Sequence, residues 1–405
     1  IGRIESLPMD PLPMRSGGEV KDFTGAIEDY GPLDKPLQRA IKKNMKVMCR
    51  EIEMGVAAAQ KALVHSGLSE DRDPERCGCL FGCDYILTRP EEFADGLINC
   101  RNAAGGEWRV ADWPTGGLHK VNPLWLLKYL PNMPNSHVSI YNDFRGPNNA
   151  ITVREASMNL SVAEATSIIQ RGAADVMLVG ATGSRIHPLR TAHVSLTERL
   201  ASEQEADPSR MARPFDTTAD GMVLGEGAGA IMLESLEHAT ARGAPVWGEV
   251  IGSGSAMVGP SASRRDYLRE ALRLAMLATI ADAGESWSDD HHIHANGLSD
   301  PSVDASEALA IGDVLAERNM AGTRVTAAKS YFGNLGAGAA AVEIICSLLA
   351  LKHGQLFPIR NLQQPSEQAS WSAAKAGDPA GDVFLPNSLT VLGQAACLAI
   401  ARVAS

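Results

Sequence analysis

The chain has 405 residues, of which 45% are hydrophobic and 21% charged, and its formal net charge at pH 7 is −11. This composition is typical of a globular protein with a large core, and the length allows two or three structural units. The acidic balance argues against a nucleic-acid partner, because phosphate binding needs a broad basic surface. No uninterrupted apolar run approaches the ~20 residues that span a bilayer, so we predict no membrane span.

The sequence contains seven cysteines. An odd number in a large chain with no secretory segment predicts reduced thiols and a cytoplasmic protein. Cys77, Cys79 and Cys83 lie close together, but a metal site needs a fourth ligand and usually a Cys-x-x-Cys pair. We therefore expect neither a metal nor a cofactor, and we interpret residues 77–82 as a buried strand that enters a glycine turn.

Apolar runs alternate with helix-like stretches along the chain, which is the pattern of an α/β protein with mostly parallel strands. A helix rich in small residues is predicted from about residue 155 to 170, and residues 336–352 have a similar composition. Gly172 and Gly354 follow these two helices as candidate C′ residues. Helices with few large side chains can approach one another closely, so we expect both in a central buried layer.

Four blocks of sequence resemble, in order and with sensible spacing, the motifs of the β-ketoacyl synthases. In that family Gly-Pro-Asn or Gly-Pro-Ser precedes a nucleophilic cysteine at a helix start, Arg-Pro-Phe-Asp and Gly-Glu-Gly-Ala-Gly follow, and two histidine motifs come later. The corresponding blocks are Gly146-Pro147-Asn148, Arg213-Pro214-Phe215-Asp216 with Gly225-Glu226-Gly227-Ala228-Gly229, His294-Ala295-Asn296-Gly297, and Lys329-Ser330 with Gly333-Asn334. The resemblance covers nearly the whole chain.

The resemblance implies the thiolase fold, a five-layer α/β/α/β/α sandwich of two similar halves. We place the boundary near Gly248, which gives an N-terminal ketosynthase half of residues 1–248 and a C-terminal half of residues 249–405. The family opens with a strand and a Thr-Gly-x-Gly turn, and neither follows Ile1. We expect about two dozen residues of that fold, one strand and a turn at ordinary lengths, to lie upstream or to have been removed.

In the family, three side chains carry out the condensation. A thiolate at the helix start accepts the acyl chain, and two histidines stabilise the enolate that forms from the malonyl thioester. Matched by motif, these positions are Glu155, Asn296 and Asn334. A carboxylate stabilised at a helix start is a poor nucleophile. An asparagine still donates a hydrogen bond, but it cannot shuttle a proton near neutral pH.

The residues Lys329, Asp304 and Glu307 match the family and have two interpretations. They either provide the electrostatic environment of the family's catalytic site or form a buried ion pair that holds the two halves together. We favour the second interpretation.

Glu155 itself is interpreted as an inert carboxylate, held by backbone N–H groups and by a cation such as Arg154 or a partner's residue. The family's last signature, a glycine-rich loop beside the nucleophile, has lost its phenylalanine and several glycines here. The corresponding candidate substrate-binding residues are Thr390, Val391, Leu392 and Gly393.

Three functions remain open. The first, which we favour, is a non-condensing partner or chain-length-determining subunit of fatty-acid or polyketide biosynthesis, resembling homologues in which glutamine usually replaces the cysteine. The second is an acyl-thioester transferase or decarboxylase in which Glu155 is a general base and Asn296 and Asn334 form an oxyanion hole, or in which Cys83 is a displaced nucleophile. The third is a structural scaffold without a ligand.

The resemblance implies an acyl carrier protein as a partner, and a homodimer or a heterodimer with an active ketosynthase through residues 122–140 and 146–152. Carrier proteins are acidic, so they could dock on basic residues at helical spacing, although most such clusters are solvated helix faces. The insert of residues 102–120, with Trp108 and Trp113, is predicted to cap the site or a partner surface. The basic residues are Lys35, Arg39, Lys42, Lys43, Lys46 and Arg50, and also Arg264, Arg265, Arg269 and Arg273.

Overall fold

The structure is a computed structural model that describes residues 1–7, 12–103, 105–259, 264–284 and 291–403. Two six-stranded mixed sheets organise these residues, with the strand orders β1-β2-β6-β5-β3-β4 and β10-β9-β8-β11-β12-β7. The first sheet contains β1 (Gly2–Arg3), β2 (Ser16–Gly18), β3 (Cys77–Gly82), β4 (Asn148–Ile151), β5 (Val176–Ser184) and β6 (Leu224–Glu234). The second contains β7 (Glu249–Met257), β8 (His292–His294), β9 (Arg324–Thr326), β10 (Ser372–Ala373), β11 (Val383–Leu389) and β12 (Gln394–Ala401).

Helices cover both faces of each sheet. Those of the first part of the chain are α1 (Lys35–Asn44), α2 (Arg50–Ser66), α3 (Glu91–Ala103), α4 (Met133–Asn142), α5 (Ser157–Gln170), α6 (Pro188–Thr197) and α7 (Leu236–Ala241). Those of the second part are α8 (Arg264–Ala283), α9 (Pro301–Glu317), α10 (Lys329–Phe332) and α11 (Ala339–His353).

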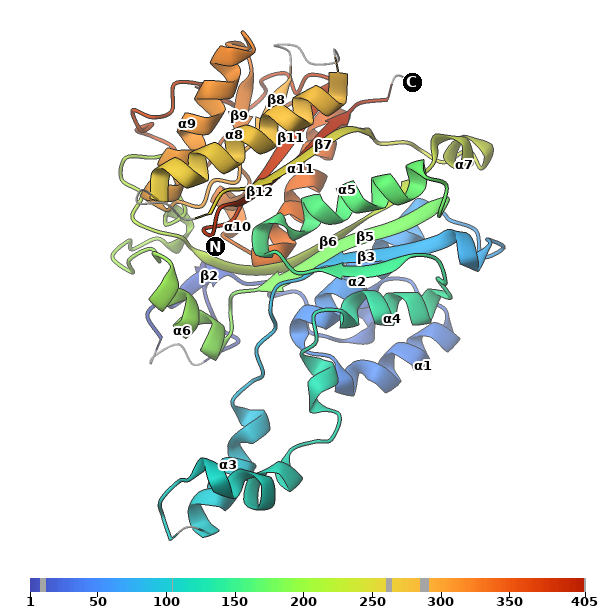
Figure 1. Cartoon of the computed structure of the whole chain (residues 1–405), viewed down its shortest axis with the longest axis vertical. Coiled ribbons are helices and arrows are strands. Elements are labelled where there is room, and N and C mark those ends of the chain that lie inside the picture. Colours follow the sequence, from blue (N-terminus) through green and yellow to red (C-terminus); the bar gives the residue numbers. More distant parts are fainter. Residues whose placement is uncertain (8–11, 104, 260–263, 285–290, 404–405) are drawn as a thin grey trace.

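The helices and sheets stack in five layers (Figure 1). Helices α2 and α4 pack on the outer face of the first sheet, and α8, with α9 beside it, packs on the outer face of the second. Between the sheets lie α5 and α11, which contact strands of both sheets and each other. This is the α/β/α/β/α sandwich of two similar halves, the thiolase fold, and the prediction from the sequence is confirmed.

Small residues let the central layer pack closely, as predicted. A Cβ on Gly338 would lie 2.3 Å from the Gly227 carbonyl oxygen of β6, and one on Gly183 would lie 2.1 Å from the Leu335 oxygen. The predicted C′ glycines, Gly172 and Gly354, have φ values of +70° and +69°. Glycine adopts this left-handed conformation without the steric cost that a side chain brings.

The stretch Gly336–His353 is long and apolar enough, by length and composition alone, to cross a membrane, with a mean hydropathy of 1.3. Within the described residues it is the one such helix, and 61% of it is buried inside the protein. The helix α11 belongs to the central layer between the sheets, so its apolar character is explained by the core that it fills.

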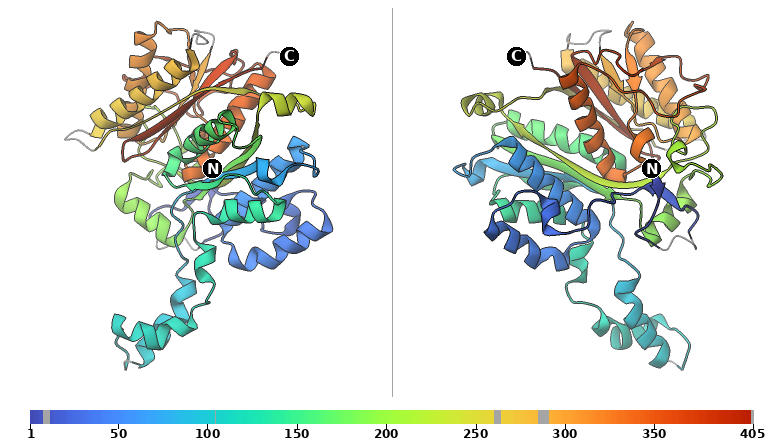
Figure 2. Two further views of the ribbon diagram at one scale, coloured as in Figure 1. Left: turned by 45° about the vertical axis from the view of Figure 1, so that its right-hand side comes forward. Right: turned by 180° about the vertical axis from the view of Figure 1, so that it is seen from behind.

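An arm that includes α3 projects from the sandwich, as both views of Figure 2 and Figure 1 show. Its own small core contains Phe93, whose ring centroid lies 5.9 Å from that of Trp113 and 5.1 Å from that of Trp125. The predicted insert therefore stands away from the body and does not cap the centre of the molecule. It leaves large apolar side chains exposed, among them Ile98, Val110 and Leu118.

The predicted cysteine strand is confirmed as β3, in which every residue is buried. Cys79 and Cys83 are fully inaccessible, and both are free thiols. Among the described residues, no three histidine, cysteine, aspartate or glutamate side chains group so as to hold a metal ion.

Candidate functional site

Glu155 lies where the chain enters the central helix α5. A short 3-10 turn, Arg154–Ala156, leads directly into Ser157, and Ser157 Oγ donates to the Cys83 carbonyl oxygen at 3.1 Å. Arg154 adopts a φ of +51°, which is unusual for a residue with a long side chain and costs backbone energy. This entry turn directs Glu155 inward, where only 2% of the residue is exposed.

Arg154, Glu155, Arg185 and Glu198 form a buried group of charges that we call the arginine–glutamate cluster. Arg185 donates from Nη2 to Glu155 Oε1 and from Nη1 to Glu198 Oε1, the latter at 3.1 Å. Arg154 donates from Nη2 to Glu198, and its Nε lies 3.6 Å from Glu155 Oε2. Two positive and two negative charges make the cluster neutral. The predicted partner Arg154 is present, but Arg185 makes the shorter contact with Glu155.

The surroundings of Glu155 favour its ionised form. Burial would raise the pKa of this carboxyl, but the charges of Arg185 and Arg154 and a hydrogen bond from Asn334 outweigh it and lower the pKa below its usual range. A carboxylate with a low pKa is a weak base and a weak nucleophile. Glu155 is therefore arranged to hold charge rather than to react.

Asn334 is in direct contact with Glu155, as the alignment of motifs predicts for two positions of one site. Its Nδ2 donates to Glu155 Oε1 at 3.0 Å and lies 2.9 Å from Met222 Sδ. Its Oδ1 accepts the Gly336 N–H at 2.9 Å. The side chain is fully used by the protein, so it has no donor left for a substrate carbonyl.

Asn296 is held by Lys329 instead. Lys329 Nζ donates to the Asn296 carbonyl oxygen at 2.9 Å and to its Oδ1 at 3.0 Å. The Asn296 residue is fully buried, and its Nδ2 has no hydrogen-bond partner within the described part of the chain. Of Glu155, Asn296 and Asn334, only Asn296 keeps a donor without a partner among the described residues.

Asp304, Glu307, Lys329 and Glu343 form a second buried group, the lysine–carboxylate cluster. Lys329 Nζ lies 2.6 Å from Glu343 Oε1, and both side chains are at most 3% exposed. The predicted pairing of Lys329 with Asp304 or Glu307 as an ion pair between the halves is wrong, because the lysine reaches Glu343 within residues 249–405. Lys329 and Glu343 lie on α10 and α11, which follow each other in the chain.

The other two carboxylates of this cluster bind backbone. Glu307 accepts the N–H groups of Asn296 at 2.6 Å and Gly297 at 2.8 Å. Asp304 accepts those of Leu298 at 2.8 Å, Ser299 at 3.0 Å and, from the first half, Phe215 at 2.9 Å. Asp304 thus links the halves through a hydrogen bond to backbone, not through an ion pair.

Burial raises the pKa of Asp304 to about 8 and that of Glu307 to about 7, although the N–H bonds act in the opposite direction. Asp304 and Glu307 therefore fix the backbone of the loop after β8 through hydrogen bonds and not through ion pairs.

His294 belongs to the same sequence block as Asn296 and lies two residues before it. His294 Nδ1 bonds to Ser347 Oγ at 2.8 Å, and its Nε2 accepts the Ala328 N–H at 3.1 Å. Burial lowers its pKa well below the usual value. With both ring nitrogens occupied, the neutral imidazole of His294 is a structural group.

The alternative nucleophile, Cys83, is completely buried. Burial, reinforced by the negative charge of Glu51, raises the pKa of the thiol well above its usual value. A thiolate is the reactive form of cysteine, so this position is unsuited to acyl transfer.

Residues 390–393 form the tight turn between β11 and β12. The Thr390 N–H donates to the Gln394 oxygen at 2.9 Å, and Thr390 Oγ1 bonds to Gln394 Oε1 at 3.1 Å. The Val391 oxygen accepts from Tyr267 at 2.9 Å. At Gly393, where φ is +88°, a Cβ would lie 2.2 Å from the Val258 oxygen. This turn is closed by its own bonds, and substrate contact by Thr390, Val391, Leu392 and Gly393 stays a prediction.

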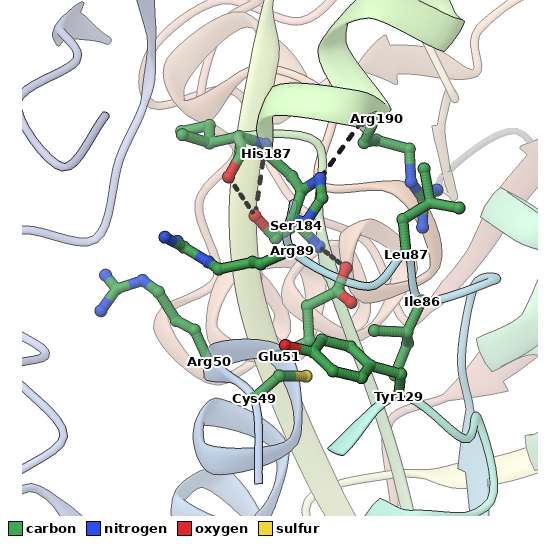
Figure 3. A pocket seen from close by; sticks show the side chains of 11 residues that line it. Cys49, Arg50, Glu51, Ile86, Leu87, Arg89, Tyr129, Ser184, His187 and Arg190 are labelled. Carbon is green, nitrogen blue, oxygen red and sulfur yellow. Dashed lines mark hydrogen bonds between the residues drawn. The ribbon is translucent and has the colours of Figure 1, made fainter. Parts of the chain in front are cut away.

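A small cavity lies on the other side of β5, between the start of α2 and the start of α6 (Figure 3). Within it, Glu51 Oε1 accepts the Ser184 N–H at 2.6 Å. Arg190, which lines the cavity, pairs with Asp84 at 2.8 Å. The cavity has a volume of about 30 Å³ and accommodates roughly one water molecule. This volume is far too small for an acyl chain.

The two predicted basic clusters differ in the structure. Lys35, Arg39, Lys42 and Lys43 are exposed on α1, whereas Arg50 turns inward and donates to Glu226 and to two backbone carbonyls. In the second cluster, Arg269 pairs with Asp313, and Arg273 pairs with Glu270 and Glu317. The side chains of Arg264 and Arg265 lie outside the described residues. The α1 face stays a candidate docking surface, and the described residues of the second cluster, Arg269 and Arg273, are engaged in ion pairs.

The comparisons with known proteins show the family to which the chain is related. Residues 3–239 match the family described as "Beta-ketoacyl synthase, N-terminal domain", and residues 247–363 match "Beta-ketoacyl synthase, C-terminal domain". The chain is 32% identical over 380 residues to the mitochondrial 3-oxoacyl-[acyl-carrier-protein] synthase of Arabidopsis thaliana, covering 89% of this chain and 78% of that protein. It is 29% identical over 369 residues to 3-oxoacyl-[acyl-carrier-protein] synthase 2 of Staphylococcus aureus strain N315, covering 91% and 82%.

Solved structures show the same fold. The ishigamide ketosynthase/chain length factor superposes with a TM-score of 0.79 at 23% identity, covering 99% of this chain and 91% of that one. A β-ketoacyl synthase from Burkholderia phymatum STM815 superposes with a TM-score of 0.78 at 22% identity, covering 97% and 89%.

Proposed function

The chain belongs to the β-ketoacyl synthase family, and we propose from this premise that it is a non-condensing subunit of fatty-acid or polyketide biosynthesis, acting beside an active ketosynthase in the cytoplasm. The observation that carries the proposal is the arginine–glutamate cluster. Glu155 is a buried carboxylate of lowered pKa, bound by Arg185 and by Asn334. A position so filled cannot accept an acyl chain without breaking the cluster.

The alternative of an acyl-thioester enzyme has less support. A general base works best when its pKa lies near the operating pH, and the pKa of Glu155 is shifted away from that range. The proposed oxyanion hole would retain one donor, the Asn296 amide, because the Asn334 amide is bound to Glu155. Cys83 is buried, and the pKa of its thiol is raised.

A two-chain assembly is the second part of the proposal. One of the similar structures is itself described as a ketosynthase/chain length factor. In this chain, α4 exposes Ile140, of which 72% is accessible, and the arm exposes Val110 and Leu118 at 69% and 54%. These exposed apolar side chains are the observation that supports a protein–protein contact. Residues 122–140 and 146–152, with β4 at the edge of its sheet, form the proposed interface.

An acyl carrier protein is the proposed docking partner. Another similar structure is described as a type II polyketide acyl-carrier protein in complex with its ketosynthase. The exposed lysines of α1 give this acidic chain a local positive face for an acidic partner.

The direct test is acylation and assembly with the intact chain. Incubation with acyl and malonyl thioesters of a carrier protein, followed by intact-mass measurement, should show no adduct and no carbon dioxide release above the blank. Co-expression with an intact Cys-His-His ketosynthase should give a heterodimer by light scattering. A stoichiometric adduct on Glu155 or Cys83 would favour the enzyme alternative, and a monomer at micromolar concentration, alone and with the ketosynthase, would contradict the assembly.

Restoring the nucleophile tests the assignment of the three positions. Glu155→Cys is expected to acylate at most, because Asn296 and Asn334 cannot replace groups that contribute roughly 10²–10⁴-fold each. Efficient condensation by this single variant would show that the asparagines suffice. The triple variant with Asn296→His and Asn334→His is the stricter reconstruction and should exceed the single variant.

A further inference from the structure

The arm joins the body through two segments of chain (Figure 2). Residues 83–89, which we call the outgoing leg, lead from the end of β3 towards α3 and have no regular secondary structure. The returning leg, residues 121–132, includes the 3-10 turn Trp125–Lys128, which contacts the turn Met45–Val47 of the body. The direction of the arm therefore depends on the groups that hold these two legs.

A buried arginine of α6 holds the outgoing leg. Arg190 is 1% exposed, and its Nη1 lies 2.8 Å from Asp84 Oδ2. Its Nη2 donates to the Tyr85 carbonyl oxygen, and its Cζ lies 3.7 Å from the centroid of the Tyr85 ring. Tyr85 Oη also bonds to His193 Nδ1 at 2.5 Å, three residues further along α6. An ion pair, hydrogen bonds and a cation–π contact thus join two consecutive leg residues to α6.

A carboxylate of the body also lies near Arg190, yet the ion pair that the arginine forms is with the leg. Glu51, on α2, lines the same small cavity as Arg190 (Figure 3). Its Oε1 accepts the Ser184 N–H at 2.6 Å. Burial raises the pKa of Glu51 to about 7, although the positive charge of Arg190 acts in the opposite direction. The short contacts of the guanidinium are directed to the outgoing leg, whereas an arginine that served the core alone would pair within the body.

The helix α6 is a fixed support for this contact, because both of its ends are bound in the body. At its start, His187 Nδ1 accepts the first N–H groups of the helix at 3.2 and 3.3 Å. Immediately after its end, Glu198 accepts hydrogen bonds from Arg185 and Arg154 of the arginine–glutamate cluster. Arg190 therefore joins the outgoing leg to an element that the core already holds in place.

We propose that Arg190 is a positioning residue for the arm, which fixes the outgoing leg and so holds the arm in the orientation that binds the partner subunit. It acts through the leg, since the buried side chain itself offers no surface to a partner. The role in partner binding rests on the proposed two-chain assembly, whereas the hold on the leg does not. An arm that samples many orientations binds only in the competent fraction, so the apparent dissociation constant rises as that fraction falls.

Limited digestion with chymotrypsin tests the hold on the leg, because Tyr85 and Leu87 are cleavage sites that become available when the leg opens. Arg190→Met removes the ion pair, the hydrogen bond and the cation–π contact. The rate of cleavage after Tyr85 and Leu87, followed by mass spectrometry of the fragments, should rise by about tenfold or more. Arg190→Lys keeps a charge beside Asp84 but lacks the planar fork that reaches both leg residues, so its rate should lie between those of the parent and Arg190→Met.

Two further variants separate an open leg from a destabilised protein. Arg242→Met removes an arginine that likewise binds a carboxylate, Glu234, and a backbone carbonyl, that of Ser66, on the side of the molecule where α7 lies (Figure 1). It should leave cleavage of the leg unchanged. Because Arg190→Met leaves Asp84 buried without its cation, the double variant Asp84→Asn with Arg190→Met removes both charges. It should keep the urea midpoint of the parent and still show fast cleavage of the leg.

The affinity of the same variants for an intact Cys-His-His ketosynthase tests the link to assembly. If about one tenth of the arm orientations are competent, the dissociation constant rises about tenfold for Arg190→Met and for the double variant. It should rise less for Arg190→Lys and stay unchanged for Arg242→Met. Cleavage of the leg at the parent rate in both Arg190→Met and the double variant overturns the inference, whatever the affinity.

Faster cleavage of the leg with an unchanged dissociation constant overturns the claim that the orientation of the arm serves the partner. A parent chain that forms no complex with the ketosynthase would contradict the proposed assembly, and the cleavage rates would still decide whether Arg190 holds the leg.

Discussion

The two buried charged clusters lie in the two similar halves and are built on different principles. In the arginine–glutamate cluster, side chains bind side chains, with Arg185 shared between Glu155 and Glu198. In the lysine–carboxylate cluster, the carboxylates of Asp304 and Glu307 bind five backbone N–H groups, and only Glu343 pairs with a cation.

The arginine–glutamate cluster fills the interior around Glu155, whereas the lysine–carboxylate cluster fixes the backbone of the loop around Asn296. A cluster of side chains can be exchanged for apolar groups of similar volume with little loss of stability. A carboxylate that orders a loop cannot be exchanged in this way, because its backbone donors would remain buried without an acceptor. We therefore expect single substitutions in the lysine–carboxylate cluster around Asn296 to lower stability. The residues of the arginine–glutamate cluster around Glu155 should be replaceable by apolar residues when they are changed together.

The largest effect is expected from Lys329→Met. This change leaves Glu343 buried without its cation, so the free energy of unfolding should fall by about 3–5 kcal/mol. Urea denaturation measures the loss, and Lys375→Met, at an exposed lysine, should change stability by less than about 0.5 kcal/mol. A loss below about 1 kcal/mol for Lys329→Met would mean that the lysine contributes little to the stability of the lysine–carboxylate cluster.

A smaller loss, about 2–3 kcal/mol, is expected for Arg185→Met, because Arg154 remains beside both glutamates. The double variant Arg185→Met with Glu155→Met removes one charge of each sign and should regain most of that loss. Denaturant midpoints of the two single variants and the double variant give the coupling energy. Strictly additive losses would contradict the view that the cluster acts as one replaceable unit.

The two clusters should depend on pH with opposite sign. The pKa of Glu155 is lowered, so its contribution to stability is complete above its unfolded pKa of about 4.3 and is lost as the pH falls below it. The pKa of Asp304 is raised to about 8, so the folded state gains stability as the pH falls from about 9 towards the unfolded pKa of about 3.9.

Denaturant midpoints between pH 3 and pH 9 check both signs. The advantage of the parent over Glu155→Gln should shrink between pH 5 and pH 3, and its advantage over Asp304→Asn should grow between pH 9 and pH 6. A difference that stays constant with pH for either variant would contradict the corresponding pKa direction.

The smallest effect is expected for Asn296→Ala. Lys329 loses one acceptor but keeps the Asn296 carbonyl oxygen at 2.9 Å and the Glu343 carboxylate at 2.6 Å. The loss should be about 1 kcal/mol by thermal or chemical denaturation. A loss as large as that of Lys329→Met would show that Lys329 stabilises the protein mainly through the Asn296 side chain and not through the loop backbone.

The five-layer architecture was predicted from the family resemblance, and local features predicted its α/β class and its central helices. Small residues mark α5 and α11, glycines mark their ends, and the apolar strands between them require cover on both faces. The contact between Glu155 and Asn334, which are 179 positions apart, came only from the resemblance. Residue spacing carries no information on such a contact.

Arg185, Glu198 and Glu343 were not predicted. Arg185 directly follows β5 and Glu198 directly follows α6, at positions where charged residues are ordinarily solvated. Nothing in the local pattern marks them as buried, because their burial results from the way distant elements pack. The prediction for Lys329 was wrong for the same reason, since its partner was chosen from the motif that carries Asp304 and Glu307 rather than from α11.

The neutrality of the arginine–glutamate cluster also constrains how this chain can change over generations. A substitution that removes Glu155 alone strands a positive charge in the core, and one that removes Arg185 alone strands a negative charge. A cysteine at position 155 would therefore be tolerated better after Arg154 or Arg185 has become neutral than before. The order of substitutions matters, because the two arginines that contact Glu155 stabilise a carboxylate at this position.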